Sequence, residues 1–161
     1  MAQTYDAIAS YTFGSAASSY TFSSLPASWT DLILVVTGTT TSGANNCRYY
    51  FNGDNTSGLY SRTSLYGTGS AAGSSRGTSS NYAYAADATT TQSPNIIQIM
   101  NYANSNVYKT SLVRGGAADN IVITRVNLWR NTNAITSITV DTDGSTWASG
   151  TTMTLYGIKA A

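Results

Sequence analysis

Short runs of β-branched and aromatic residues alternate with turns rich in Gly, Asn, Ser and Thr along the whole chain. The strongest run is Asp31–Thr37, a continuous apolar stretch that Gly38 ends, and the longest is Ile121–Arg130. Runs of about four to eight residues are typical of strands, and no stretch carries the 3.6-residue apolar period of an amphipathic helix. The pattern therefore predicts an all-β fold.

The spacing of these runs predicts about ten strands, of which Asn95–Tyr102 and Val107–Val113 form a hairpin. Within Ile121–Arg130, side chains at alternate positions such as Val122, Val126 and Leu128 share one face. The segment 67–80 is rich in Gly, Ser and Ala and would suit a disordered tether, but its flanking strands favour a long surface loop. The expected strands are Tyr5–Ala9, Ser19–Phe22, Asp31–Thr37, Arg48–Asn52, Leu59–Tyr66, Asn95–Tyr102, Val107–Val113, Ile121–Arg130, Ile135–Val140 and Thr151–Ile158.

Strands separated by polar turns favour an antiparallel two-sheet sandwich, and the preferred topology is jelly-roll-like. A length of 161 residues corresponds to a single domain, residues 1–161, in which residues 1–18 form either a first strand or an N-terminal arm. Because chain ends often lie close together, we expect the terminal strand to pair near the N-terminal strand, with Leu155 and Ile158 buried.

Charge is scarce in this chain, since charged residues make up 9% of it against about 25% in an average protein. The net charge is +1, and the eight basic residues are scattered from Arg48 to Lys159. Binding of nucleic acid requires a clustered basic face, so no nucleic-acid partner is expected. The start of the chain does not resemble a signal peptide, and no apolar run approaches the about 20 residues that span a bilayer. We therefore expect synthesis in a cytoplasm and no membrane partner.

The residues that most enzymes need are missing. The chain has no His and no Glu, and Cys47 is its one cysteine. These absences remove Ser-His-Asp and Cys-His catalysis and the usual zinc ligands, and Cys47 is expected to be a small buried side chain. Asp141 and Asp143 form the one close carboxylate pair, which suits a hairpin turn better than a metal site because no acidic residue follows at EF-hand spacing. We predict no catalytic residue, cofactor or metal, although distant Asp residues could still converge in a glycosidase cleft.

Twelve Tyr and three Trp remain as candidates for contacts. Aromatic rings anchor protein interfaces and stack on sugars, but Tyr is also common on half-buried sheet faces. Trp129, inside a long strand, is expected in the core or between subunits, whereas Trp29 at a strand entrance is expected to be partly exposed. The candidate interface or glycan contacts are Trp29, Tyr49, Tyr82 and Tyr84.

Several short segments match a known family in order and spacing. They are Tyr20–Pro26 followed by Thr30–Val35, Tyr50–Asp54, Leu128–Arg130, Ala134–Ile138, and Ala148–Gly150 with Leu155–Ile158. With these segments the chain resembles small β-rich virion structural proteins of tailed bacteriophages, of the marine and cyanobacterial type. The resemblance implies a β-sandwich on a phage particle and provides no catalytic residue to transfer. Its position on the capsid, the tail or a fibre is left open.

Three functions of different classes follow from these observations. The preferred one is a structural protein of the virion, a capsid decoration or appendage protein that binds other virion proteins. The second is a carbohydrate-binding module that attaches the particle to a host surface glycan, and aromatic residues lining one groove would favour it. The third is a depolymerase, which converging Asp residues would favour. The surplus aromatics, including Tyr-rich strands at 49–50 and 82–84, and the low charge predict a homo-oligomer. The resemblance implies a trimer, since phage appendages often have that symmetry.

Overall fold

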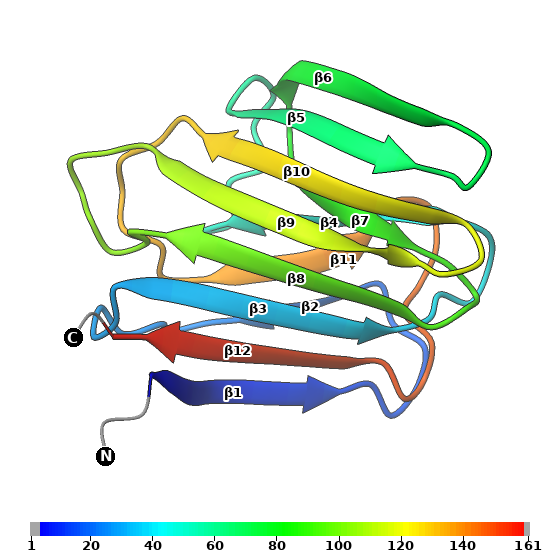
Figure 1. The fold of residues 1–161 in the computed structure, drawn as a ribbon. Helices are drawn as coiled ribbons and strands as arrows, with labels where there is room; N and C mark the ends of the chain where they lie inside the picture. Colours follow the sequence, from blue (N-terminus) through cyan, green and yellow to red (C-terminus); the bar gives the residue numbers. More distant parts are fainter. Residues whose placement is uncertain (1–3, 160–161) are drawn as a thin grey trace.

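The computed structural model describes residues 4–159, which form twelve strands in two antiparallel sheets (Figure 1). No helix occurs in this part of the chain. The all-β, two-sheet prediction is therefore confirmed, whereas the jelly-roll topology is not confirmed. The eight-stranded sheet runs in the order β1 (Tyr5–Thr12), β12 (Thr152–Ile158), β3 (Asp31–Gly38), β8 (Ser93–Met100), β9 (Lys109–Ala117), β10 (Ile121–Trp129), β5 (Tyr60–Gly67), β6 (Ala72–Ser80). The four-stranded sheet has the order β2 (Ser19–Phe22), β11 (Ile138–Thr142), β4 (Asn45–Phe51), β7 (Ala83–Ala88).

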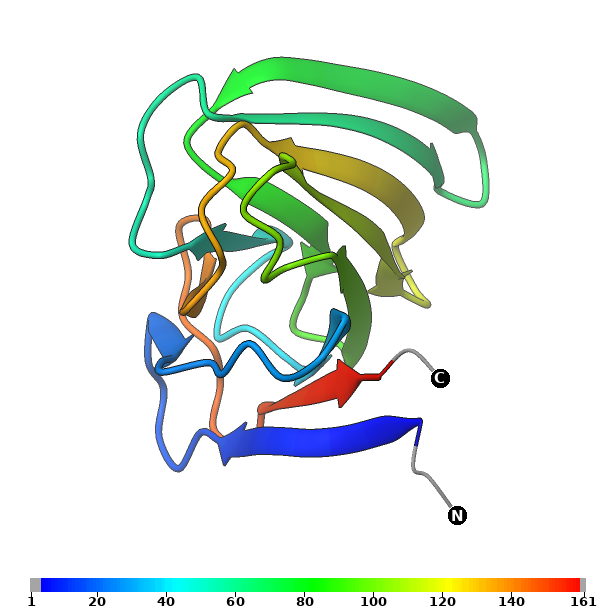
Figure 2. The same cartoon turned by 90° about the vertical axis from the view of Figure 1, so that its left-hand side faces the viewer.

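The core lies where the four-stranded sheet packs against one face of the eight-stranded sheet, as the two perpendicular views show (Figures 1 and 2). We call this face of the eight-stranded sheet its inner face and the opposite one its outer face. Leu34 and Leu155 point inward from β3 and β12, and Phe51 and Val140 of the smaller sheet belong to the same buried cluster, all essentially inaccessible to water. A fully buried side chain of this size contributes about 1.5–3 kcal/mol, so the core is the main source of stability.

The two ends of the chain are joined in one ladder. β1 pairs antiparallel with β12, from Tyr5 opposite Ile158 to Thr12 opposite Thr152, as the sequence predicted. Leu155 is fully buried, but Ile158 points to the outer face and is only half-buried, so the expectation that both are buried was wrong for Ile158. The cause is the two-residue period of a strand, which places positions 155 and 158 on opposite faces.

The segment predicted as a long loop contains a strand, β6, so this expectation was wrong. Gly73 and Gly77 provide no Cβ, and the Tyr66 and Arg62 side chains of β5 occupy that space. A Cβ at Gly73 would lie 2.7 Å from Tyr66 Oη, and one at Gly77 would lie 2.9 Å from Arg62 Nη1. Pairing with β5 therefore makes a strand of residues that have little strand propensity of their own.

β7 is an edge strand whose free backbone groups are covered by side chains of the larger sheet. The side chain of Asn127 accepts a hydrogen bond from Tyr84 N and donates one to Tyr84 O, both at 3.1 Å. Asn95 Oδ1 accepts from Ala86 N at 2.6 Å, and Arg125 Nη1 donates to the Ala85 carbonyl. These contacts explain why β8 and β10 carry polar residues on the inner face.

Lys109 is a buried cation that joins two loops. Its Nζ donates to the carbonyl oxygens of Asn104 at 2.6 Å, Val107 at 2.8 Å and Thr132 at 2.8 Å. Burial lowers the pKa of Lys109, and the three carbonyls supply partial negative charge in place of a carboxylate.

Three further predictions are confirmed by the structure. They are the hairpin of β8 and β9, the burial of Cys47 and the core position of Trp129.

Candidate binding surfaces

The polarity of β9 and β10 is partly inverted relative to an ordinary half-buried sheet. In β10 the polar residues Arg125 and Asn127 are buried on the inner face, whereas Val122 and Val126 are exposed on the outer face. In β9 Lys109 and Ser111 are buried while Leu112 is exposed. An antiparallel sheet with one solvated face normally has the reverse pattern. The outer face of β9 and β10 thus exposes apolar side chains beside polar ones such as Arg114 and Thr124.

Four of the seven exposed large apolar side chains within residues 4–159 lie close together on β5, β9 and β10, whereas Tyr5, Val107 and Tyr108 lie elsewhere. Val126 of β10 is opposite Leu112 of β9, and Leu65 of β5 is opposite Thr124 of β10. The exposed fractions of Leu65, Val122 and Val126 are 60%, 67% and 53%. We call Leu65, Leu112, Val122 and Val126 the apolar patch. Contiguous exposed apolar patches, unlike single exposed residues, mark interaction sites.

A hollow of about 610 Å³ adjoins the apolar patch at the end of the sheet formed by the β5–β6 and β9–β10 turns. Its apolar lining comes from Pro94, Ile96 and Val122, and the glycines of both turns leave it wide. Arg114 of β9 contributes the cation that lines it. Concave apolar surfaces with a few polar groups are the usual form of binding sites.

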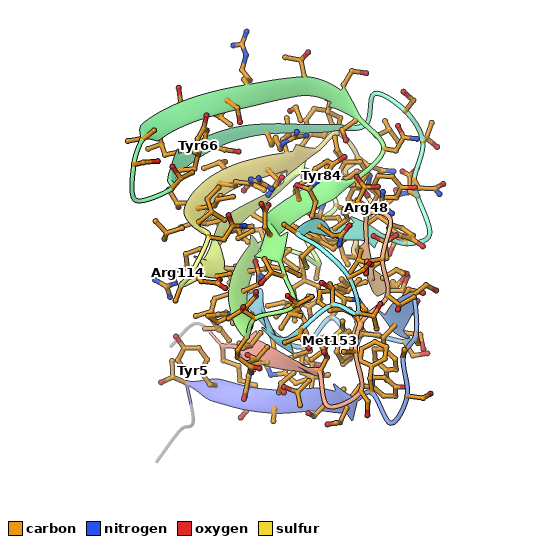
Figure 3. All side chains as sticks on the ribbon, turned by 90° about the vertical axis from the view of Figure 1, so that its right-hand side faces the viewer. Tyr5, Arg48, Tyr66, Tyr84, Arg114 and Met153 are labelled. Atoms are coloured by element: carbon orange, nitrogen blue, oxygen red, sulfur yellow. The ribbon has the colours of Figure 1, made fainter. Side chains whose placement is uncertain are left out.

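The guanidinium of Arg114 is exposed and points away from the smaller sheet (Figure 3). Its cross-strand neighbours are Ile96 and Thr124, neither of which carries a charge. Within residues 4–159 it has no ion pair and no hydrogen bond. Arg114 is therefore free to pair with an acidic group of another molecule.

A second cluster, on the smaller sheet and the β5 side chains above it, combines Arg and Tyr (Figure 3). The Cζ atom of Arg48 lies 4.3 Å from the ring centre of Tyr82, and the Cζ atom of Arg62 lies 4.1 Å from the ring centre of Tyr84. Arg48 also donates to Asp141 at 2.9 Å and to Asp143 at 2.8 Å. Burial raises the pKa of Asp141, and the Arg48 hydrogen bond opposes this shift. One ring face of each tyrosine is therefore already occupied by a guanidinium.

The predicted contact residues fall in different places. Tyr82 and Tyr84 are half-buried in the Arg–Tyr cluster, where the structure brings them together. Tyr49 is fully buried, and its hydroxyl hydrogen-bonds Ser111 and Asn127, so it must be removed from the candidate contacts. Trp29 is partly exposed as expected, but its ring packs on Gly157 and its Nε1 donates to Asp6. Sequence reasoning missed Arg114 and the apolar patch, because alternation alone does not say which face of a strand is covered.

The potential metal-ligating side chains are dispersed in the described part of the chain. No group of three potential metal-ligating side chains occurs within residues 4–159. Asp141 and Asp143, the close carboxylate pair, both form ion pairs with the guanidinium of Arg48. Their carboxylates therefore meet at Arg48 and not at a shared metal ion. Asp141 lies in β11, so the expected turn begins only after it, around Asp143 and Gly144.

Comparison of the chain with protein-family models, with curated proteins and with solved structures gave no match. The resemblance to phage virion proteins therefore stays a prediction. Residues 4–159 contain no helix with the length and apolarity needed to cross a membrane.

Proposed function

We propose that this chain is a structural protein of a tailed phage particle that acts by binding another virion protein, without catalysis. It is made in the host cytoplasm and functions on the virion. The observation that carries the proposal is the apolar patch on the uncovered outer face of the eight-stranded sheet. The resemblance of the sequence to virion proteins names the class of partner.

Burial of the patch would provide the free energy of binding. Burying apolar surface is worth about 25 cal/mol per Å², and the energy of an interface is concentrated in a few central side chains. Val126 and Leu112 are directly opposite one another, and they form the one cross-strand pair within the patch. We therefore expect these two side chains to contribute most to binding.

Arg114 favours a partner that presents an acidic side chain among apolar ones, since opposite charges set register and specificity at interfaces. A second copy of this chain has few unpaired acidic side chains that could bind Arg114. The chain has seven acidic residues, all Asp, and six of them already bind groups of their own chain. These are Asp6, Asp31, Asp54, Asp119, Asp141 and Asp143. The seventh, Asp87, is half-buried on the other sheet. The outer face is therefore proposed to bind a different protein.

Co-sedimentation with phage particles that lack this chain tests the proposal. The wild-type protein should bind them, and Val126→Lys should weaken binding at least about tenfold, equivalent to about 1.4 kcal/mol. Ser19→Lys is the matched control, because it adds the same charge at an exposed position of the smaller sheet. Arg114→Gln should also weaken binding and reduce its dependence on salt.

Two results would overturn the proposal. One is a wild-type protein that does not bind the particles, and the other is Val126→Lys binding as well as Ser19→Lys. A protein that ignores the particles and binds a host polysaccharide would support the carbohydrate-binding alternative. The structure gives that alternative less support, because Arg48 and Arg62 cover ring faces on which a sugar would stack.

A further inference from the structure

Four strands form the edges of the two sheets, and three of them are protected against pairing with another chain. β1 has a bulge near its middle, between Ala7 and Ala9. β2 has only four residues, and the free edge of β7 is covered by Asn95, Arg125 and Asn127. Bulges, short strands and covered edges are the usual devices that prevent edge-to-edge association.

β6 is the unprotected edge. It has nine residues, pairs with β5 on one side only, and lies at the margin of the molecule away from the smaller sheet (Figure 2). It contains no Pro, and its one charged residue is Arg76. Its irregularity falls beyond Gly77, toward the end of the strand, which leaves the segment 72–77 in regular register. This segment is a ready template for another strand.

The hydrogen-bond pattern shows which backbone groups are free. Thr68 N donates to Ala71 O at 2.9 Å in the hairpin turn, so these two residues form a hydrogen-bonded pair. Such pairs alternate along an antiparallel ladder. The N–H and C=O groups of Ala72, Ser74 and Arg76 therefore point away from β5 and have no partner strand within residues 4–159.

We propose that two copies of this chain associate through β6, each pairing its segment 72–77 antiparallel with that of the other around a two-fold axis. Two eight-stranded sheets would then form one continuous sheet. Ser74 and Ser75 are small and exposed, so the pairing brings no bulky side chains together. A register centred at Ser74 or Ser75 places Arg76 opposite a neutral residue, which avoids the repulsion of two arginines directly opposite each other.

This arrangement makes the assembly a two-fold dimer in place of the trimer expected from the resemblance. It uses the edge of the sheet and leaves the outer face free, so it does not depend on the partner proposed for that face. The two outer faces would instead become neighbours in one larger surface. A failure of either proposal would leave the other standing.

Sedimentation velocity on the purified full chain tests the dimer. The wild type and Ser74→Ala should both be dimers at about 0.1 mM, well above a micromolar dissociation constant. Ser74→Pro should be a monomer with a nearly unchanged melting temperature, because it removes an N–H that points away from β5. Ser74→Lys places a new positive charge close to Arg76 or to the same substitution in the second copy. It should therefore raise the dissociation constant at least about tenfold.

Hydrogen exchange supplies a readout that does not need a folded variant. In the wild type, the amides of Ser74 and Arg76 should exchange more slowly as the protein concentration rises, while the amide of Val107 should not change. A monomeric wild type at about 0.1 mM, a trimer, or an association that persists in both Ser74→Pro and Ser74→Lys would overturn the proposal.

Discussion

Gly157 lies directly under the indole ring of Trp29, and this contact makes a sharp test of packing. A Cβ at position 157 would lie 2.3 Å from Trp29 ring atoms, so the ring would have to move. Its movement would break the hydrogen bond from Trp29 Nε1 to Asp6, which is 3.2 Å long. We expect Gly157→Ala to lower the free energy of unfolding by about 1–3 kcal/mol, measured by urea denaturation.

Gly14→Ala is the control for this substitution. A Cβ at Gly14 would meet no heavy atom within 4 Å, so the variant should stay within about 0.5 kcal/mol of the wild type. Equal effects of the two substitutions would contradict the packing of Trp29 described above.

The ion pair of Arg48 with Asp141 makes a prediction that depends on pH. Both side chains are 16% exposed, so removing Arg48 leaves a largely buried carboxylate without its partner. We expect Arg48→Met to cost about 2 kcal/mol at neutral pH. Chemical denaturation of both proteins at pH 7 and at about pH 4 would measure the loss.

The sign of the pH effect follows from Asp141. Burial raises its pKa above the ordinary value even with Arg48 present. A carboxyl whose pKa is raised by folding stabilises the fold below its unfolded pKa, and this contribution is lost as the pH rises through the folded pKa. Without Arg48 the pKa rises further, so the variant should lose less stability at about pH 4 than at neutral pH. Arg76→Met, at an exposed position without an ion pair in the described structure, should show no such difference.

At the scale of elements, sequence reasoning succeeds where a strand carries its own apolar signal. β3 and β10 agree with their predicted bounds to within a residue, because their β-branched runs are strand-forming in any context. β6 was missed because its sequence has no β-branched or aromatic residue apart from Thr78, and only pairing with β5 makes it a strand. The residues of a strand carry its own propensity signal, whereas the strand with which it pairs is set by the fold of the whole chain.

The candidate surfaces were predictable only in part for the same reason. Tyr82 and Tyr84 could be selected as aromatics at a strand, but their guanidinium partners come from β4 and β5. The exposure of Leu112 and Val126 depends on which face meets β7, and the sequence of one strand contains no information about that face. Tyr49 was a wrong candidate contact because its burial depends on the same long-range choice.

β12 is the element whose removal should do the most damage. It lies between β1 and β3 and pairs with both, so deletion of residues 151–161 would separate β1 from the sheet, remove Leu155 from the core and expose the β3 edge beside Leu34. We expect the truncated chain to be insoluble or unfolded on expression. Addition of a peptide spanning residues 151–161 during refolding should restore part of the native signal. Normal solubility and melting of the truncation would contradict this role.

At the scale of the whole molecule, the pairing pattern predicts slow and cooperative folding. β1 pairs with β12 and β2 pairs with β11, so each sheet includes strands from both ends of the chain. Such long-range pairings are costly to form and typically give folding times of milliseconds to seconds. Because each sheet is complete only when strands from both ends of the chain have paired, we expect one unfolding transition for the whole molecule.

Two tryptophans in distant positions allow this prediction to be tested. Trp29 reports on the β1–β12 side of the larger sheet through its contact with Gly157, and Trp129 reports on β10, where it is buried against Phe51 and Tyr60. Comparison of Trp29→Phe with Trp129→Phe changes which of the two regions contributes to the fluorescence, while the contribution of Trp147 is present in both variants. For each variant, the fluorescence midpoint in urea should coincide with its circular dichroism midpoint, and refolding should follow a single phase. A fluorescence transition that precedes the loss of β-structure in one variant alone would mean that the β1–β12 edge and the centre of the sheet unfold separately. The ladder joining the chain ends would then stabilise only its own edge.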